Sequence, residues 1–212
     1  MASLQQLIEG FRRFRERHFT RDNALYSTLV ARGQTPKTLV VSCCDSRVDP
    51  ALVLDCEPGD LFVIRNVANL VPPAESSNSG HHGTSAALEF GVRNLKVEHI
   101  IVFGHAQCSG IRALIETGET NSDTESYIGD WMRLAQSARA EVLQEMPDAP
   151  LEDKIDACEL RAILVSLRNL ETFPWIRERV ENGTLTLHGW YFDIEDGKLL
   201  QYDAAAGKFA AL

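Results

Sequence analysis

Short apolar runs that alternate with helical patterns constrain the fold of this chain more than any other feature. Thr38–Cys43 reads TLVVSC, is rich in β-branched residues and stops at a polar cluster, as a buried strand of an α/β sheet does. Asp60–Arg65, introduced by the turn signal Pro58-Gly59, and Glu98–Gly104 follow the same rule. Thr184–Asp193 is predicted as a late strand.

Helical periodicity fills the intervals between and after these strands. Apolar residues recur at helical spacing in Thr84–Leu95, Ser109–Glu116, Glu125–Gln144, Glu152–Leu170 and Trp175–Glu181. This alternation favours an α/β fold with a mainly parallel β-sheet core flanked by helices and right-handed crossovers. In such folds ligands bind at the C-terminal ends of the strands. With no linker-like segment in the sequence, we expect a single domain, residues 1–212.

The N-terminal segment, residues 1–32, is predicted to form a helical arm. Between Leu4 and Phe19 apolar residues recur roughly at helical spacing, with arginine and glutamate between them. The segment lacks the apolar core of a signal peptide, and its arginines are interleaved with glutamates. We therefore expect a cytoplasmic protein.

Composition argues against several classes of partner. The formal net charge of -9 at pH 7 makes a nucleic-acid partner improbable, because such binding depends on basic surfaces. No apolar run approaches the roughly 20 residues that span a bilayer, so we expect no membrane partner. Five cysteines are an odd number, unevenly spaced, which suits reduced thiols better than a disulfide framework.

Two polar motifs follow directly on two of the predicted strands. Cys43-Cys44-Asp45-Ser46-Arg47 ends the first strand, and Gly104-His105-Ala106-Gln107-Cys108 follows the strand at Glu98–Gly104. Neighbouring parallel strands bring their C-terminal ends together, so Cys43, His105 and Cys108 can converge on one ion. Two thiolates and one imidazole are ligands suited to Zn²⁺. Each motif alone is weak, because a cysteine after a strand is more often a core residue.

Together, Cys43-x-Asp45-Ser46-Arg47 and His105-x-x-Cys108 resemble the two-part signature of the β-class carbonic anhydrases. The resemblance runs in order along nearly the whole chain and includes these further segments: Gln34, Pro58-Gly59-Asp60, Arg65-Asn66-Val67-Ala68-Asn69, Ala86-Ala87-Leu88-Glu89 and Gly189-Trp190. It implies four parallel strands plus a late edge strand, an arm that embraces a neighbouring subunit, and a homodimer or a multiple of the dimer.

The resemblance also implies an activity, the reversible hydration of carbon dioxide to bicarbonate and a proton, with one Zn²⁺ per chain. Hydroxide bound to zinc attacks carbon dioxide, and Asp45 orients this nucleophile while Arg47 holds Asp45 off the metal. By resemblance the following residues line the substrate pocket: Gln34, Phe62, Val67, Phe90 and Gly110. Phe90 stands where many relatives have tyrosine, and Ser109 where glycine is usual.

Other readings remain open from the sequence. The same zinc site can act on carbon disulfide or carbonyl sulfide, as in some relatives, or Asp45 can close it permanently in a non-catalytic zinc protein. A cysteine-based redox or phosphatase enzyme ranks below these, since the chain has no Cys-x-x-Cys pair. His81 and His82 are minority candidates for proton transfer. Cys44, Cys56 and Cys158 are interpreted as structural thiols.

Overall fold

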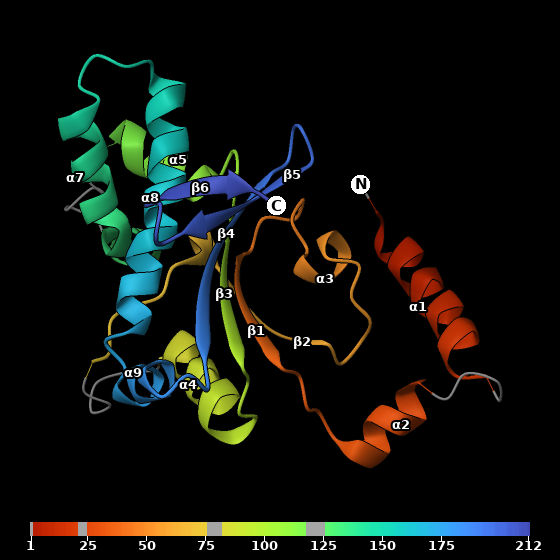
Figure 1. Ribbon diagram of the computed structural model, residues 1–212. Coiled ribbons are helices and arrows are strands. Elements are labelled where there is room, and N and C mark those ends of the chain that lie inside the picture. Colours follow the sequence, from red (N-terminus) through yellow and green to blue (C-terminus); the bar gives the residue numbers. More distant parts are fainter. Residues whose placement is uncertain (1, 21–24, 76–81, 118–125) are drawn as a thin grey trace. The chain divides into compact units, whose positions relative to one another are not determined.

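A computed structural model describes residues 2–20, 25–75, 82–117 and 126–212 (Figure 1). The chain divides into two compact units, Met1–Thr35 and Pro36–Leu212, and each is described by itself. Within the described ranges every helix is too short or too polar to span a lipid bilayer. The expectation of a single domain over residues 1–212 stays a prediction.

Two helices form the N-terminal unit, as the predicted arm requires. α1 (Leu4–His18) begins at a capping box, in which Ser3 and Gln6 each accept a hydrogen bond from the other's backbone N–H. The ring of Phe14 packs edge-on against Tyr26 of α2 (Leu25–Arg32), with centroids 5.5 Å apart. No residue of α1 is buried, and its apolar side chains include Phe11, which is 61% exposed. The arm therefore has an exposed apolar face.

The second unit is built on one sheet of six strands in the order β2-β1-β3-β4-β5-β6. The first four strands in this order are parallel, and β5 and β6 are antiparallel additions. Their bounds are β1 (Thr38–Cys43), β2 (Leu61–Asn66), β3 (His99–His105), β4 (Thr186–Asp193), β5 (Lys198–Asp203) and β6 (Lys208–Ala211). The predicted fold class is confirmed, and the four predicted strands coincide with β1 to β4 to within two residues at each end.

The antiparallel edge is larger than predicted, because two strands follow β4 where we expected a single edge strand. Tight turns connect β4 to β5 and β5 to β6, and each contains a glycine with positive φ, Gly197 at 66° and Gly207 at 65°. Glycine adopts this conformation without steric cost, so each turn can reverse the chain at once. Both added strands are short and mostly half-exposed, and they carry little of the apolar signal that marks a core strand.

The helices of the second unit lie along the sheet and at its edges (Figure 1). Their bounds are α3 (Pro50–Val53), α4 (Gly83–Glu89), α5 (Ser109–Thr117), α6 (Tyr127–Met132), α7 (Gln136–Glu145), α8 (Leu151–Leu170) and α9 (Pro174–Glu181). A π-helical turn, η2 (Phe90–Asn94), continues α4, and 3-10 turns lie at η1 (Val67–Asn69) and η3 (Arg133–Ala135). The predicted helix Glu125–Gln144 is therefore interrupted at η3.

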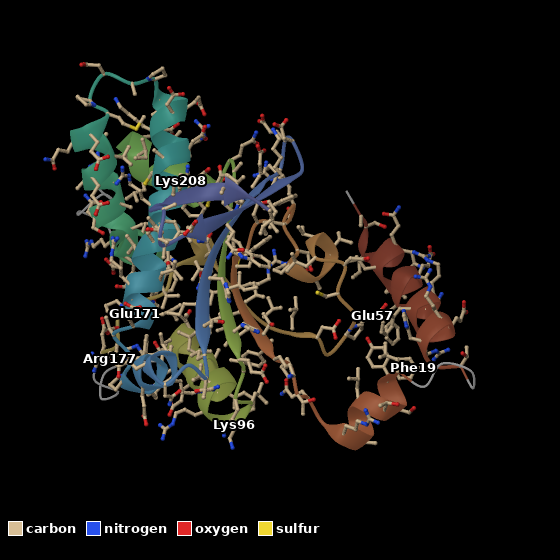
Figure 2. All side chains as sticks on the ribbon, in the orientation of Figure 1. Phe19, Glu57, Lys96, Glu171, Arg177 and Lys208 are labelled. Atoms are coloured by element: carbon tan, nitrogen blue, oxygen red, sulfur yellow. The ribbon has the colours of Figure 1, made fainter. Side chains whose placement is uncertain are left out.

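The long helix α8 covers one face of the sheet and contacts β3 and β4. A Cβ atom at Gly104 would lie 2.7 Å from the Ile163 side chain, and one at Gly189 would lie 2.9 Å from it. Only glycine permits this close approach of helix and strands. On the other face Val40, Ile101 and Phe103 form a smaller apolar cluster. Side chains fill both layers in Figure 2, where Lys96, Glu171, Arg177 and Lys208 are at exposed positions.

Candidate active site

Three buried side chains converge at the C-terminal end of the parallel strands. Ser42 of β1 lies opposite Phe103 of β3, so Cys43 and His105 end adjacent strands, and Cys108 stands just before α5. The ligand atoms of Cys43, His105 and Cys108 all lie within 4.8 Å of one another. Their exposed fractions are 5%, 1% and 2%. Among the described residues this is the group of three that can hold a metal ion.

The tautomer of His105 suits a metal ligand. Nδ1 lies 2.7 Å from the carbonyl oxygen of Ala106, an acceptor only, so Nδ1 carries the proton and donates it. Nε2 then bears the lone pair, and this buried atom has no hydrogen-bond partner among the described residues. A buried acceptor left unpaired is costly, whereas a bound cation would satisfy it. The donor set of one nitrogen and two sulfurs therefore fits zinc.

The thiols of Cys43 and Cys108 are joined by a hydrogen bond. The hydrogen bond from the Cys108 thiol lowers the pKa of Cys43 below its ordinary value, although burial opposes this shift. The same contact, together with burial, raises the pKa of Cys108. Cys43 is therefore the more acidic of the two thiols, and the proton of Cys108 lies between the two sulfurs. A divalent cation is suited to replace this proton, because both sulfurs then bind as thiolates.

The loop that follows Cys43 is held by an arginine from the neighbouring strand. Arg65 of β2 donates to the carbonyl oxygens of Cys43 at 3.0 Å, Asp45 at 2.8 Å and Val48 at 2.9 Å. The N–H of Asp45 in turn points to the Cys43 sulfur at 3.4 Å. These bonds fix the backbone of the loop, and with it the direction of the Asp45 side chain.

Asp45 and Arg47 form a bidentate ion pair beside the three ligands. Arg47 Nε donates to Asp45 Oδ1 at 3.0 Å and one terminal nitrogen donates to Oδ2 at 2.8 Å. Hydrogen bonding from Arg47 lowers the pKa of Asp45 to about 2, so the carboxylate is ionised at neutral pH. Its Oδ2 lies 4.0 Å from Nε2 of His105. The structure therefore brings the predicted catalytic pair to the predicted ligands.

Two residues that support this site, Glu159 and Gln107, were not predicted from the sequence. Glu159 of α8 is 3% exposed and accepts hydrogen bonds from the N–H of Cys108 at 2.7 Å and the hydroxyl of Tyr191 at 2.8 Å. Gln107 links Arg47 to Glu195. A glutamate on the apolar face of a predicted helix was a usable signal for Glu159, because such positions are normally aliphatic. Gln107 had no such signal.

The predicted pocket residues separate into two groups. Val67 and Gly110 lie together, since a Cβ atom at Gly110 would stand 3.1 Å from the Val67 side chain. Phe62 and Phe90 stack on each other with centroids 5.9 Å apart. However, Phe62 pairs with Leu39, four residues before Cys43 in β1, which places it about 13 Å down the sheet. Within one chain these two phenylalanines do not meet the metal ligands. Gln34 belongs to the N-terminal unit.

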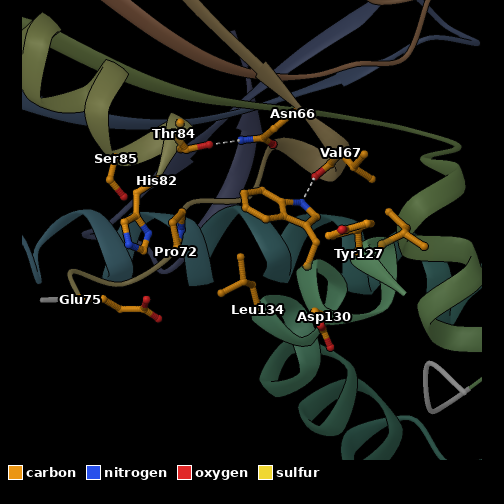
Figure 3. Close-up of a pocket in the computed structure, with 13 residues that line it drawn as sticks. Asn66, Val67, Pro72, Glu75, His82, Thr84, Ser85, Tyr127, Asp130 and Leu134 are labelled. Carbon is orange, nitrogen blue, oxygen red and sulfur yellow. Dashed lines mark hydrogen bonds between the residues drawn. The ribbon is translucent and has the colours of Figure 1, made fainter. Parts of the chain in front are cut away.

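A large groove adjoins Val67 (Figure 3). Its volume is about 740 Å³, and its wall includes Val67, Pro72, Trp131 and Leu134. The indole N–H of Trp131 donates to the carbonyl oxygen of Val67 at 2.8 Å and so fixes the turn that carries Val67. His82, one of the two candidates for proton transfer, lines this groove, and His81 lies outside the described residues.

The remaining cysteines lie outside the ligand cluster. Cys44 is exposed, Cys56 is partly buried and Cys158 is buried in α8. Burial raises the pKa of Cys158 to about 12, and it also raises the pKa of Cys56. The raised pKa values make the thiols of Cys56 and Cys158 weakly reactive at neutral pH, whereas the exposed position of Cys44 does not fit a core thiol.

Comparison with known proteins gives a consistent set of relatives. A family model described as carbonic anhydrase matches residues 38–199. A carbonic anhydrase of Synechocystis is 38% identical over 208 residues, which are 98% of this chain and 74% of that protein. The solved structure of the β-carbonic anhydrase CcaA superposes with a TM-score of 0.90 at 38% identity and covers 99% of this chain and 92% of the other.

A more distant solved structure has the same fold. It belongs to a pair of tetrameric β-carbonic anhydrases from Sordaria macrospora, with a TM-score of 0.74, 26% identity and coverage of 98% of this chain and 95% of the other. The fold, the cluster of Cys43, His105 and Cys108, and these matches over nearly all of the sequence agree. The chain belongs to the β-carbonic anhydrase family and is a zinc-dependent carbonate dehydratase, which hydrates carbon dioxide reversibly to bicarbonate.

Proposed function

We propose that Cys43, His105 and Cys108 hold the one zinc ion of each chain and that Asp45 and Arg47 direct the reaction beside it. The observation that carries this assignment is the buried, unpartnered Nε2 of His105, which stands within 4.8 Å of both sulfurs. Zinc, when bound, supplies the Lewis acid that makes hydroxide available near neutral pH. Three protein ligands leave one position open for chemistry.

Asp45 acts as an acceptor that orients the nucleophile. Its low pKa keeps the carboxylate ionised, and an ionised carboxylate can only accept hydrogen bonds. Arg47 occupies both oxygens from one side and so restrains the rotation of the carboxylate. Oδ2, on the side of His105, is left to accept a hydrogen bond from the attacking group.

Val67 and Gly110 supply one wall of the carbon dioxide site. Val67 offers the apolar surface that a linear, weakly polar substrate needs, and it packs directly against the first turn of α5. At the start of this helix the backbone N–H groups of Gly110 and Ile111 donate to the Cys108 sulfur, so the same turn also positions this cysteine. A side chain at Gly110 would press on Val67 and narrow the site.

We further propose that a second copy of the chain completes the pocket. By resemblance Phe62, Phe90 and Gln34 stand at pocket positions of the family, with Phe90 in place of a common tyrosine, yet the two phenylalanines lie far from the metal ligands of their own chain. β2 is the edge strand of the sheet, and Val63 on it and Phe90 beside it are 38% and 42% exposed. An edge of this kind can pair with a second copy and deliver its phenylalanines to the neighbouring site.

Mixed dimers test this shared pocket. A chain with His105→Ala provides intact phenylalanines but no zinc site, and a chain with Phe62→Ala and Phe90→Ala provides the zinc site alone. If the pocket is shared, co-expressed mixed dimers hydrate carbon dioxide faster than either parent dimer. Mixed dimers with only the average activity of the parents would refute the shared pocket.

We infer a reducing compartment, the cytoplasm, for this protein. The five cysteines are free in the structure, and two of them serve the metal site as thiolates. Oxidation of either sulfur would remove a ligand. Measurement of zinc release under oxidants of graded strength, together with fractionation of the source cells, tests this inference.

Stopped-flow hydration of carbon dioxide is the experiment that tests the proposal as a whole. It is performed on protein of known zinc content, with a sulfonamide inhibitor as the control. Inhibitable hydration at one zinc per chain supports the assignment. Zinc without hydration would instead favour a closed structural site or turnover of carbon disulfide or carbonyl sulfide, which the same assay measures with those substrates.

A further inference from the structure

Gln107 holds an unusual backbone conformation at the edge of the active site. It is one of the two residues between His105 and Cys108, and its φ is 59°, in the left-handed region that favours glycine. A glutamine there is strained where glycine would be relaxed, and such strain is typically retained where the side chain has a task. The contacts of the Gln107 side chain show what this task is.

The side chain of Gln107 bridges a cation and an anion. Its Oε1 accepts a hydrogen bond from a terminal nitrogen of Arg47 at 3.1 Å, and its Nε2 donates to Glu195 on the turn between β4 and β5. A guanidinium only donates and a carboxylate only accepts. In the reverse orientation the amide NH2 would face the donors of Arg47, and the amide oxygen would face the carboxylate of Glu195. The amide orientation is therefore fixed by its two charged neighbours.

Arg47 is consequently anchored on two sides. One edge of the guanidinium binds both oxygens of Asp45, and the other donates to Oε1 of Gln107 and, at 3.0 Å, to its carbonyl oxygen. Arg47 is half-exposed, with 46% of its side chain accessible, and one ion pair at such a site holds a long side chain weakly. The contacts with Gln107 add an anchor that does not depend on Asp45.

We propose that Gln107, itself held by Glu195, is a positioning residue that keeps Arg47 in place and thereby keeps the Asp45 carboxylate turned away from the metal. This inference rests on the proposed roles of Asp45 and Arg47. A carboxylate that Arg47 no longer restrains is itself a good zinc ligand and would compete for the open position. The hydrogen bonds of the Gln107 side chain go to Arg47 and Glu195, so it acts through Arg47.

Gln107→Met tests the proposal, because methionine has a similar length but neither the acceptor nor the donor. The loss of exposed hydrogen bonds predicts a fall in kcat of roughly three- to tenfold, with zinc content and thermal midpoint unchanged. In the cobalt-substituted protein, the dissociation constant of azide, followed by visible absorption, rises by a similar factor because Asp45 competes for the metal. Asp196→Asn, on the same turn as Glu195, is the matched control and leaves all four quantities unchanged.

An exchange of the two partners sharpens the test. Gln107→Glu alone places two carboxylates together and lowers kcat. When it is combined with Glu195→Gln, the carboxylate at 107 accepts from Arg47 and the amide at 195 donates to that carboxylate. Recovery of kcat and azide affinity in the double variant supports the proposal. The absence of recovery, an unchanged Gln107→Met protein, or a loss of its zinc or thermal stability would each overturn it. A wild-type protein without zinc or hydration would instead refute the proposed function.

Discussion

Strand β3 carries a histidine at each end, and the two have opposite surroundings. His105, at the C-terminal end, is 1% exposed, donates Nδ1–H to a backbone carbonyl and leaves Nε2 without a partner beside two thiols. His99, at the N-terminal end, is half-buried, and its Nδ1 lies 2.6 Å from the hydroxyl of Thr186 on β4. His188 lies 2.9 Å from the same hydroxyl through Nε2.

This contrast shows what makes a histidine a metal ligand. Polar side chains lie at both ends of the strand. At the N-terminal end the ring centroids of His99 and His188 are 5.5 Å apart. There a hydroxyl, which can donate one hydrogen bond and accept others, meets both rings. At the C-terminal end no hydrogen bond from the described residues satisfies the buried nitrogen, and two cysteine sulfurs lie beside it. A cation is the partner that this end lacks.

Removal of the buried imidazole is expected to have the largest effect. His105→Ala should lose most bound zinc, because three protein ligands leave no redundancy, and carbon dioxide hydration should fall below about one per cent of the wild-type rate. Elemental analysis and stopped-flow kinetics measure the two losses. His99→Ala, at the opposite end of the same strand, is the control and should retain both. Full zinc in the His105 variant would refute the ligand assignment.

A change at Asp45 should separate orientation from metal binding. Asp45→Asn keeps the size of the side chain but removes its charge, so zinc should stay while turnover falls by about a hundredfold, as for the loss of an acid–base group. Glu98→Gln, at the N-terminal end of the sheet, removes a comparable ion pair with Lys37 and serves as the control. Unchanged turnover in the Asp45 variant at all pH values would contradict its role.

The difference between the two ends also shows how far the sequence could be interpreted. The parallel strands and the cluster of Cys43, His105 and Cys108 were predictable because both depend on short local patterns, apolar runs followed directly by a polar motif. The pairing of β1 with β3 then follows from the rules of α/β sheets. His99 and His188 have no surrounding motif in the sequence, and the structure places a ring nitrogen of each within hydrogen-bond distance of the Thr186 hydroxyl.

Other features required the three-dimensional structure. The register of β2 decides that Phe62 lies beside Leu39 and not beside Cys43, and register is a property of strand pairing. The positive φ of Gln107 has no signature in a glutamine. Glu159 on α8 reaches the N–H of Cys108 across a separation of 51 residues, which no local pattern reveals. The sequence therefore predicts the ligands better than the contacts that hold them.

A smaller effect is expected from removal of the Thr186 hydroxyl, which lies within hydrogen-bond distance of His99 and His188. Thr186→Val preserves the shape of the side chain and removes its hydrogen bonds, so the free energy of unfolding should fall by about 1 kcal/mol. Zinc content and turnover should stay at the wild-type level, because the change lies at the other end of β3. Urea denaturation measures the first quantity. A loss of zinc in this variant would show that the two ends are coupled.

The smallest effect is a pH dependence of stability at this same end. Burial, and then the nearby charge of His99, lower the pKa of His188 below its ordinary value of 6.5. In the folded protein the ring is therefore neutral over a range in which the unfolded chain already binds a proton. Below the ordinary pKa the unfolded state binds more protons, so stability falls as the pH decreases through this range. His188→Gln removes the titrating group and should flatten this part of the curve.

Urea midpoints at about pH 7.5 and 5.5, compared between the variant and the wild type, isolate the contribution of His188 from that of the carboxylates, which both proteins retain. Parallel curves would mean that His188 titrates alike in the folded and unfolded chains, and the contrast between the two ends of β3 would then rest on hydrogen bonding alone.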